Sequence, residues 1–331
     1  MDFKQFFLTI GAVMVSMWVA AQSPGNVIVL KNAMNSIVSG DAKIEKLADG
    51  FLFIEGPLWH PDGYLLFSDI PANKIMKYVP GQGVSVYLEN SGFVGSEDEI
   101  TGQGSNGLTF DLSGNLIICQ HGARQILKAD LAGNFTPLAR QFGGKRLNSP
   151  NDVVVKSDGT IFFTDPPWGL AKGVDDPAKE LDFQGVFILK SGNLTLLDNA
   201  LKLPNGLAFS PDEKYLYVTD SDGSRKLYYR YELAENGMLK DKQLFFDASE
   251  LKGQGGPDGI KVDSKGNCYF TGPGGVLVIN PKGEHIGTIA PPEVPANLAF
   301  GGKDGKTLFM TCRTGLYAIE LKVEGILPWK K

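Results

Sequence analysis

The stretch Pro204-Asn205-Gly206-Leu207-Ala208-Phe209 decides the fold, because its pattern returns along the chain. It consists of a polar residue, a short run of small and apolar residues and then, after a turn, a second β-rich run. Six such openings align: Glu55-Gly56-Pro57-Leu58-Trp59, Asn106-Gly107-Leu108-Thr109-Phe110, Asn151-Asp152-Val153-Val154-Val155, Asn205-Gly206-Leu207-Ala208-Phe209, Asp258-Gly259-Ile260-Lys261-Val262 and Asn297-Leu298-Ala299-Phe300. They begin about 40 to 55 residues apart, which is the period of β-propeller blades. The repeat predicts six structural units of one kind.

Each unit continues with the signals of further strands. Turns such as Asp62-Gly63 and Asp158-Gly159 follow the opening and indicate a β-hairpin. A third β-rich run and a more variable fourth run come next, as in residues 74–79 and 84–88. We therefore expect an all-β fold, a six-bladed β-propeller with four antiparallel strands per blade. The alternative is a β-sandwich whose segments resemble one another by accident.

The two ends of the repeat predict how the propeller closes. Residues 42–54 precede the first full unit, and the last unit ends near Leu321. An N-terminal strand from this segment should complete the last blade, so that strand pairing closes the circle of blades.

The N-terminal segment has the features of an export signal. Lys4 precedes an apolar run, residues 6–21, which ends in Val19-Ala20-Ala21 before Gln22. The competing interpretation is a membrane anchor, but the run is shorter than the roughly 20 apolar residues that span a bilayer. The sequence predicts a signal peptide at residues 1–21 and a single propeller domain at residues 22–331, with an N-terminal extension over residues 22–41. The mature protein would be periplasmic or secreted, with no membrane association.

Charge, cysteines and missing motifs exclude several functional classes. The formal net charge is −5 and Lys/Arg clusters are absent, so nucleic acid is not an expected partner. Cys119, Cys268 and Cys312 are too far apart in sequence for a compact zinc site, and we expect three buried free thiols instead of one disulfide and one thiol. The motifs G-x-S-x-G and H-E-x-x-H and the P-loop do not occur. The absence of these three motifs excludes the commonest serine-hydrolase, zinc-protease and nucleotide-binding sites.

The polar residues that open the units are the main candidates for chemistry. The innermost strand of a propeller blade lines the central channel, so residues at its start should converge near the axis. We call these six the axial residues: Glu55, Asn106, Asn151, Asn205, Asp258 and Asn297. Two carboxylates and four amides suit one hard divalent cation such as Ca²⁺, with Zn²⁺, Mn²⁺ and Mg²⁺ as alternatives. The competing interpretation is that Asn and Asp stand there only as turn residues.

Motifs around these residues resemble the SMP-30/gluconolactonase/luciferin-regenerating enzyme-like family, and among its members the bacterial gluconolactonases. The similarity covers roughly residues 45–321 and consists of seven motifs in order: Glu55-Gly56-Pro57 with Trp59, Gln120-His121-Gly122, Arg146-Leu147-Asn148-Ser149-Pro150-Asn151-Asp152, Phe163-Thr164-Asp165-Pro166-Pro167-Trp168-Gly169-Leu170, Pro204-Asn205-Gly206-Leu207, Pro257-Asp258-Gly259 and Thr271-Gly272-Pro273-Gly274-Gly275. The resemblance implies a divalent metal held by Glu55, Asn205 and Asp258, with Asn151 at the metal or on the substrate. Animal members have a sugar-binding Arg where this chain has Ser149.

The reaction that the resemblance implies is metal-dependent hydrolysis of a small sugar lactone, a carboxylic ester, to the aldonic acid. Asp258 is the candidate general base, and the alternative is that it serves only as a metal ligand. The candidate substrate-binding residues are Asn106, His121, Asn151, Trp168 and Asn297. Two other functions stay open, a non-catalytic binding propeller with a structural calcium and a metal-dependent esterase or phosphotriesterase-like hydrolase. We expect a monomer or a weak dimer.

Overall fold

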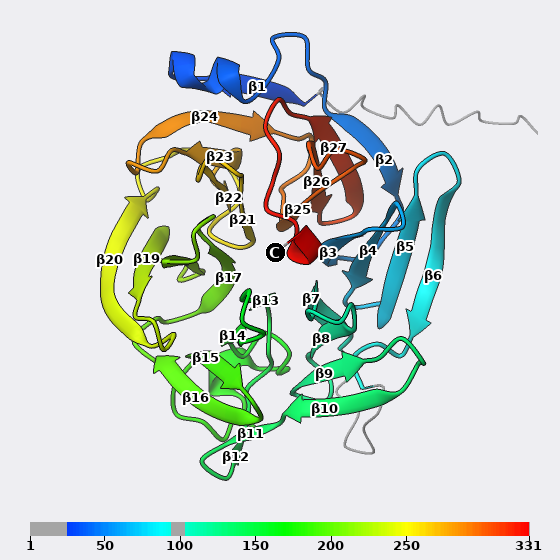
Figure 1. Cartoon of the computed structure of the whole chain (residues 1–331), viewed down its shortest axis with the longest axis vertical. Coiled ribbons are helices and arrows are strands. Elements are labelled where there is room, and N and C mark those ends of the chain that lie inside the picture. Colours follow the sequence, from blue (N-terminus) through cyan, green and yellow to red (C-terminus); the bar gives the residue numbers. More distant parts are fainter. Residues whose placement is uncertain (1–24, 94–102, 331) are drawn as a thin grey trace, which may run out of the picture.

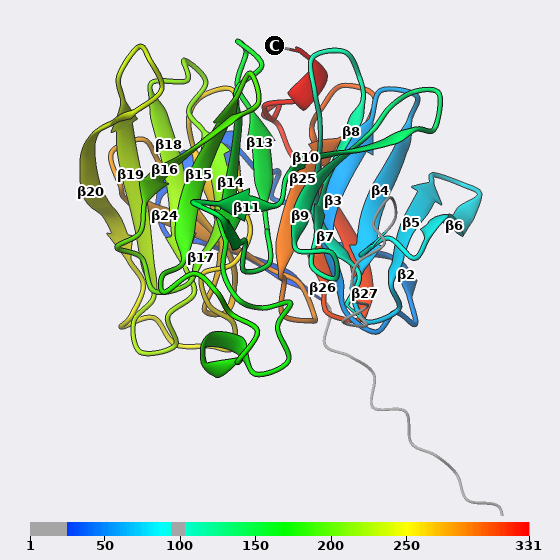
Figure 2. The same cartoon turned by 90° about the horizontal axis from the view of Figure 1, so that it is seen from below.

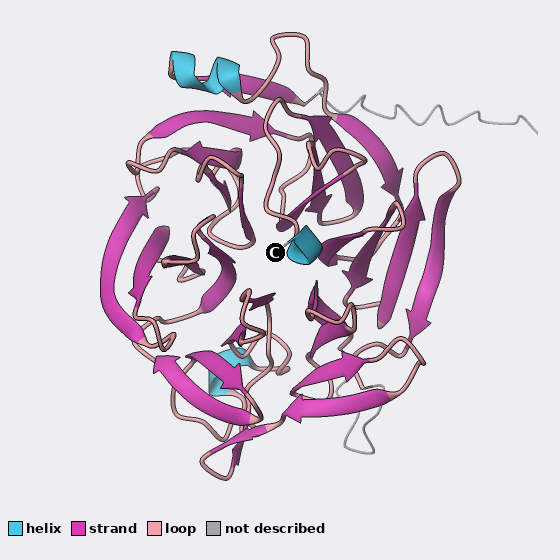
Figure 3. Ribbon diagram, viewed as in Figure 1, coloured by secondary structure: helices cyan, strands magenta, loops and turns pink. Residues whose placement is uncertain are grey.

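The protein is a ring of six β-sheets around a central axis (Figure 1). The computed structural model describes residues 25–93 and 103–330. The described chain is nearly all strand and loop, with three short 3₁₀ turns (Figure 3). The strands of each sheet are antiparallel and follow one another from the axis to the rim. The prediction of a six-bladed β-propeller is therefore confirmed.

The bounds of the strands, from the axis outward, are as follows. The first three blades contain β3 (Ile54–His60), β4 (Tyr64–Asp69), β5 (Lys74–Val79) and β6 (Gly83–Glu89); β7 (Ser105–Phe110), β8 (Leu116–Gln120), β9 (Gln125–Ala129) and β10 (Phe135–Ala139); and β13 (Val153–Val155), β14 (Ile161–Asp165), β15 (Gly185–Lys190) and β16 (Asn193–Asp198). The other three contain β17 (Pro204–Phe209), β18 (Tyr215–Asp220), β19 (Leu227–Leu233) and β20 (Leu239–Asp247); β21 (Ile260–Val262), β22 (Cys268–Gly272), β23 (Gly275–Ile279) and β24 (His285–Ala290); and β25 (Asn297–Gly301), β26 (Thr307–Cys312) and β27 (Gly315–Glu320).

The last blade takes its fourth strand from the N-terminal part of the chain, as predicted. Strand β2 (Glu45–Asp49) pairs antiparallel with β27, with Glu45 opposite Ala318 and Asp49 opposite Gly315. The chain then continues directly into β3 of the first blade. Strand pairing thus joins the two ends of the ring.

The segment expected as an N-terminal extension contributes a further strand. β1 (Asn26–Val29) pairs with the outer strand β24 and makes the fifth blade five-stranded. The 3₁₀ turn η1 (Asn32–Ser36) then buries Met34 in the core. A four-residue strand is too short to stand out in the sequence. The same holds for the small hairpin of β11 (Gln141–Phe142) and β12 (Lys145–Arg146). The predicted signal peptide lies outside the described residues and stays a prediction.

Neighbouring blades are held together by apolar packing between their faces. Among the described residues, six hydrophobic clusters each lie between two successive blades. At the junction of the last and first blades, Trp59 stacks on Phe309 with ring centroids 5.1 Å apart. The three cysteines are free and buried within these clusters, as expected.

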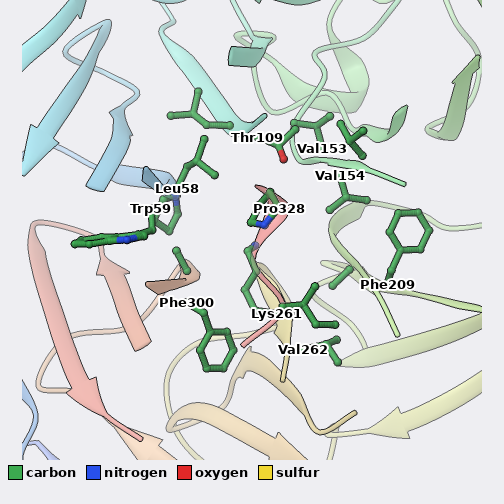
Figure 4. Close-up of a pocket in the computed structure, with 16 residues that line it drawn as sticks. Leu58, Trp59, Thr109, Val153, Val154, Phe209, Lys261, Val262, Phe300 and Pro328 are labelled. Atoms are coloured by element: carbon green, nitrogen blue, oxygen red, sulfur yellow. The ribbon is translucent and has the colours of Figure 1, made fainter. Parts of the chain in front are cut away.

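The C-terminal segment covers one end of the central channel. The 3₁₀ turn η3 (Pro328–Lys330) lies over the axis (Figures 1 and 2). Beneath Pro328 is a small cavity of about 70 Å³, lined mainly by apolar residues from the later parts of the inner strands, together with Lys261 (Figure 4). The first residues of the inner strands face the opposite end, and this is where the candidate site lies. No helix in the described residues has the length and apolar character needed to span a bilayer.

Candidate active site

A cavity of about 640 Å³ lies where the inner strands begin, away from the C-terminal segment. Seven of the eight predicted site residues line it: Glu55, Asn106, His121, Asn151, Trp168, Asn205 and Asp258. Residues separated by as much as 203 positions in the chain therefore meet in one place, since 258 minus 55 is 203. Asn297 is not among the lining residues. The structure thus assembles the predicted constellation except for one amide.

Close contacts between neighbouring blades fix the backbone of the axial residues. The amide of Gly107 donates to the carbonyl of Asn151 at 2.8 Å, and the amide of Gly206 donates to the carbonyl of Asp258 at 3.1 Å. Each of these glycines follows an axial residue of its own blade. A side chain there would separate the blades, because a Cβ on Gly206 would lie 2.3 Å from the Asp258 carbonyl oxygen. Glycine at positions 107 and 206 is therefore required by the contact between neighbouring blades and not only by a turn.

Several oxygen atoms in the cavity are buried without a hydrogen-bond partner. Within the described residues, this holds for Oδ1 of Asn106, of Asn205 and of Asp258. Glu55 is 2 % exposed, and its Oε2 accepts from the amide of Gly56 at 2.8 Å. A buried polar atom without a partner costs about 1–3 kcal/mol, so three in one cavity favour a ligand or water that bonds to them. A hard divalent cation meets that need, because carboxylate and amide oxygens are its usual ligands.

The donor set also excludes other kinds of metal centre. No group of three or more His, Cys, Asp or Glu side chains that could hold a metal occurs in residues 25–93 and 103–330. A site of the zinc type, rich in His or Cys, is therefore absent from this part of the chain. The residues fit a cation that accepts two carboxylates, neutral amides and water.

The two carboxylates repel each other when no cation lies between them. Burial, together with the charge of nearby Asp152, raises the pKa of Glu55 to about 7, although hydrogen bonds with Gly56, Asn297 and Asp258 act in the opposite direction. Burial and then the charge of Glu55 raise the pKa of Asp258 well above its usual range. Ionising both groups in this environment is costly without a counter-charge. The pair is thus arranged for a positive ligand.

Cation binding should stabilise the protein more strongly as the pH rises. Because the folded pKa of Glu55 is raised from 4.5 to about 7, the contribution of Glu55 to the stability of the cation-free chain is fully present below pH 4.5 and is lost as the pH rises through 7. A cation binds the ionised form, and at 100 times its Kd it adds about 2.7 kcal/mol. We expect the Tm difference between Ca²⁺-loaded and EDTA-treated protein to increase from about pH 5 to about pH 8. A difference that stays constant or shrinks over this range would contradict the assignment.

A second group of polar residues lies behind the cavity. Oδ1 of Asn297 accepts from the amide of Leu298 at 2.8 Å and from Nζ of Lys261 at 3.4 Å. Hydrogen bonding to Asn297 also lowers the pKa values of Glu55 and Asp152, against the larger effect of burial. Asn297 therefore supports Glu55 through a hydrogen bond and does not itself line the cavity.

His121 faces the cavity with both ring nitrogens unsatisfied. Its side chain is buried, and neither Nδ1 nor Nε2 has a hydrogen-bond partner among the described residues. Burial lowers the pKa of His121 to about 4, so the imidazole is neutral at pH 7. A neutral imidazole offers one donor and one acceptor, which suits the hydroxyl groups of a polar ligand.

Trp168 stands at the rim of the cavity on a loop that is fixed from below. Its side chain is 44 % exposed. Ser149 donates to the carbonyl of Pro166 at 2.6 Å and accepts from the amide of Gly169 at 2.8 Å. Asp165 accepts from the amide of Ser149 at 2.8 Å. At the position of the animal family's sugar-binding Arg, this chain therefore has a residue that anchors the Trp168 loop.

The structure adds two charged residues that the sequence analysis missed. Asp222 and Lys226 both line the cavity. Asp222 pairs with Lys202 at 2.8 Å. Both residues belong to a polar turn without a recognisable motif, so no signal in the sequence marked them.

Comparisons with known proteins agree with this geometry. The model of the SMP-30/Gluconolactonase/LRE-like region matches residues 53–314. A gluconolactonase from Zymomonas mobilis is 36 % identical over 91 % of this chain and 87 % of its own, and a pentonolactonase from Haloferax volcanii is 26 % identical over 79 % and 81 %. The solved structure of a Xanthomonas campestris gluconolactonase superposes with a TM-score of 0.77 at 32 % identity, covering 90 % of this chain and 95 % of that one. This chain belongs to the SMP-30/gluconolactonase/LRE-like family.

Proposed function

We propose that this protein is a metal-dependent lactonase, a carboxylic ester hydrolase that opens a sugar lactone to the aldonic acid. The observation that carries the proposal is the convergence of Glu55, Asn205 and Asp258 on one cavity, with unpartnered buried oxygens on the latter two. The names of the relatives, gluconolactonase and pentonolactonase, support the reaction. Their substrates differ in the number of sugar carbons, so we propose an aldonolactone without choosing between hexose and pentose.

The axial residues divide into those that hold the cation and those that hold the substrate. Glu55, Asn205 and Asp258 would bind a divalent cation, Ca²⁺ by preference, with Asn151 at its edge. Bound there, the cation would supply Lewis-acid polarisation of the lactone carbonyl. The amides of Asn106 and Asn151 would accept from and donate to the hydroxyl groups of the sugar.

Asp258 has the position and chemistry of the general base. Its Oδ1 has no hydrogen-bond partner in the described residues, so that atom can accept a proton from the attacking water. The hydroxide adds to the carbonyl carbon, the ring C–O bond breaks, and the leaving alkoxide takes up the proton that Asp258 accepted from water, to give the hydroxy acid. The net reaction converts one lactone and one water into one aldonic acid.

His121 and Trp168 would orient the ring. The neutral imidazole of His121 is buried in the cavity wall and can bind one substrate hydroxyl on each nitrogen. Trp168, exposed at the rim, can pack its indole on the apolar face of a sugar. Together they would hold the ester carbon close to the cation and to Asp258.

Lactone hydrolysis by cation-stripped protein tests the proposal. Glucono-δ-lactone and a pentonolactone are assayed with a pH indicator, after EDTA treatment and after restoring Ca²⁺, Mg²⁺, Mn²⁺ or Zn²⁺ one at a time, with spontaneous hydrolysis subtracted. We expect activity to disappear with EDTA and to return with at least one cation. Activity that EDTA does not change would overturn the cation requirement. Folded protein that opens no lactone with any cation would overturn the reaction and favour a binding propeller.

A further inference from the structure

A pair of residues, Ser or Thr followed by Asp, ends the second strand of three blades. The pairs are Ser68-Asp69 on β4, Thr164-Asp165 on β14 and Thr219-Asp220 on β18. All six side chains are buried. These three blades also supply Glu55, Asn151 and Asn205, which are three of the four predicted metal ligands.

The Asp of each pair holds the backbone that leads into the inner strand. Its carboxylate accepts two consecutive backbone amides, and the second of these belongs to the residue two positions before the axial residue. The donors and distances are Leu52 (3.2 Å) and Phe53 (3.1 Å) to Asp69, Asn148 (2.7 Å) and Ser149 (2.8 Å) to Asp165, and Lys202 (3.2 Å) and Leu203 (2.8 Å) to Asp220. Such paired, charge-assisted bonds fix the segment from which the ligand side chain projects.

The hydroxyl of each pair reaches the next blade and binds the carbonyl of its axial residue. Ser68 donates to Asn106 at 2.7 Å. Thr164 donates to Asn205 at 2.7 Å, and Thr219 donates to Asp258 at 2.6 Å. One pair therefore ties an axial residue of its own blade to the axial residue of the following blade.

We propose that these three pairs are positioning residues that keep the metal ligands converged before the cation binds. The amide oxygens of Asn106 and Asn205 have no hydrogen-bond partner that holds them in place, so the ligand side chains depend on their backbone for convergence. The hydrogen bonds of the three pairs fix that backbone, so the ligand side chains need to rearrange less when the cation binds. The inference rests on the cation site of the proposed function and not on the lactonase reaction.

Thr219 gives a sharp test, because the sixth blade offers a matched control. Thr311 stands at the corresponding place on β26, and its hydroxyl donates at 3.2 Å to the carbonyl of Asn297 within the same blade. Both threonines are fully buried. Replacing either by Val removes one buried hydroxyl, but only Thr219 contacts a predicted ligand.

The readouts are Ca²⁺ affinity by isothermal titration calorimetry, without substrate, and thermal unfolding in EDTA. We expect Thr219→Val and Thr311→Val to lower the Tm in EDTA to a similar extent. Thr219→Val should weaken Ca²⁺ binding about 10-fold to 100-fold, as loss of a supporting contact does elsewhere, while Thr311→Val stays close to the parent chain. Thr219→Ser, which keeps the hydroxyl, should restore the affinity.

Three outcomes would overturn the proposal. They are equal losses of affinity in the two Val variants, an unchanged affinity in Thr219→Val, and a parent chain that binds none of the four cations. The last result would also remove the cation from the proposed function. Tight cation binding without lactone hydrolysis would overturn the lactonase reaction alone and leave the positioning role intact.

Discussion

Asp258→Asn should lower kcat/KM for lactone hydrolysis by at least roughly 10³-fold, or about 4 kcal/mol of transition-state stabilisation. The substitution keeps the size of the side chain but removes one of the two negative charges at the cation and the acceptor for the proton of water. It should also abolish measurable Ca²⁺ binding. Steady-state kinetics and calorimetry on the same preparation check both effects.

The same substitution should stabilise the cation-free protein. Burial and the charge of Glu55 raise the pKa of Asp258, so a neutral amide relieves a repulsion that increases with pH. We expect a higher Tm in EDTA at pH 8 than in the parent chain. Asp222→Asn is the control, because Asp222 lines the cavity but is paired with Lys202. A lower Tm for Asp258→Asn, or comparable activity losses in both variants, would count against the assignment.

The architecture of the site could be predicted from the sequence because its residues belong to the repeat. Asn205 and Asp258 stand at equivalent places in two units, and the blade symmetry alone brings equivalent places together at the axis. The family and the propeller fold are confirmed, and the strand that closes the last blade is where residues 42–54 predicted it. The roles of the individual residues stay predictions.

The distinction between lining and supporting residues could not be predicted. Asn297 repeats the sequence pattern of the other axial residues, but in the sixth blade its amide faces Lys261 and Glu55. Periodicity gives the place of a residue on a strand, whereas the direction of its side chain depends on which neighbours fill the channel. Lys261 is such a neighbour, and it belongs to a different blade.

The Ser/Thr-Asp pairs were overlooked for a related reason. Thr219-Asp220 is a polar ending of an apolar strand, and in the sequence it reads as an ordinary turn. Its partners, Leu203 and Asp258, lie in the preceding loop and in the next blade. The partner atoms in these contacts are backbone amides and carbonyls, which every residue has. The residue types of the partners therefore give no sequence pattern from which the contacts could be predicted.

Gly206→Ala should strongly destabilise the ring of blades near the site. A Cβ at this position would lie 2.3 Å from the carbonyl oxygen of Asp258 and 2.8 Å from Cα of Gly259. Both are backbone atoms of the next blade, so no side chain can move aside to make room. We expect the fourth and fifth blades to separate locally, with a loss of about 3 kcal/mol or more in unfolding free energy. Asn205 and Asp258 would move with them, and Ca²⁺ affinity should be lost.

Thermal unfolding of Gly206→Ala against Gly40→Ala separates this contact from the general effect of replacing glycine. No atom lies within 4 Å of a Cβ placed on Gly40, and its backbone is not left-handed. Gly40→Ala should leave the Tm unchanged or raise it slightly, because alanine restricts the unfolded chain. If Gly206→Ala unfolded at the same temperature as Gly40→Ala and still bound Ca²⁺, the blades would have to be free to shift at the axis. A site that relies on fixed ligand positions could not then be built there, because its amide oxygens attract a cation only when they are held together.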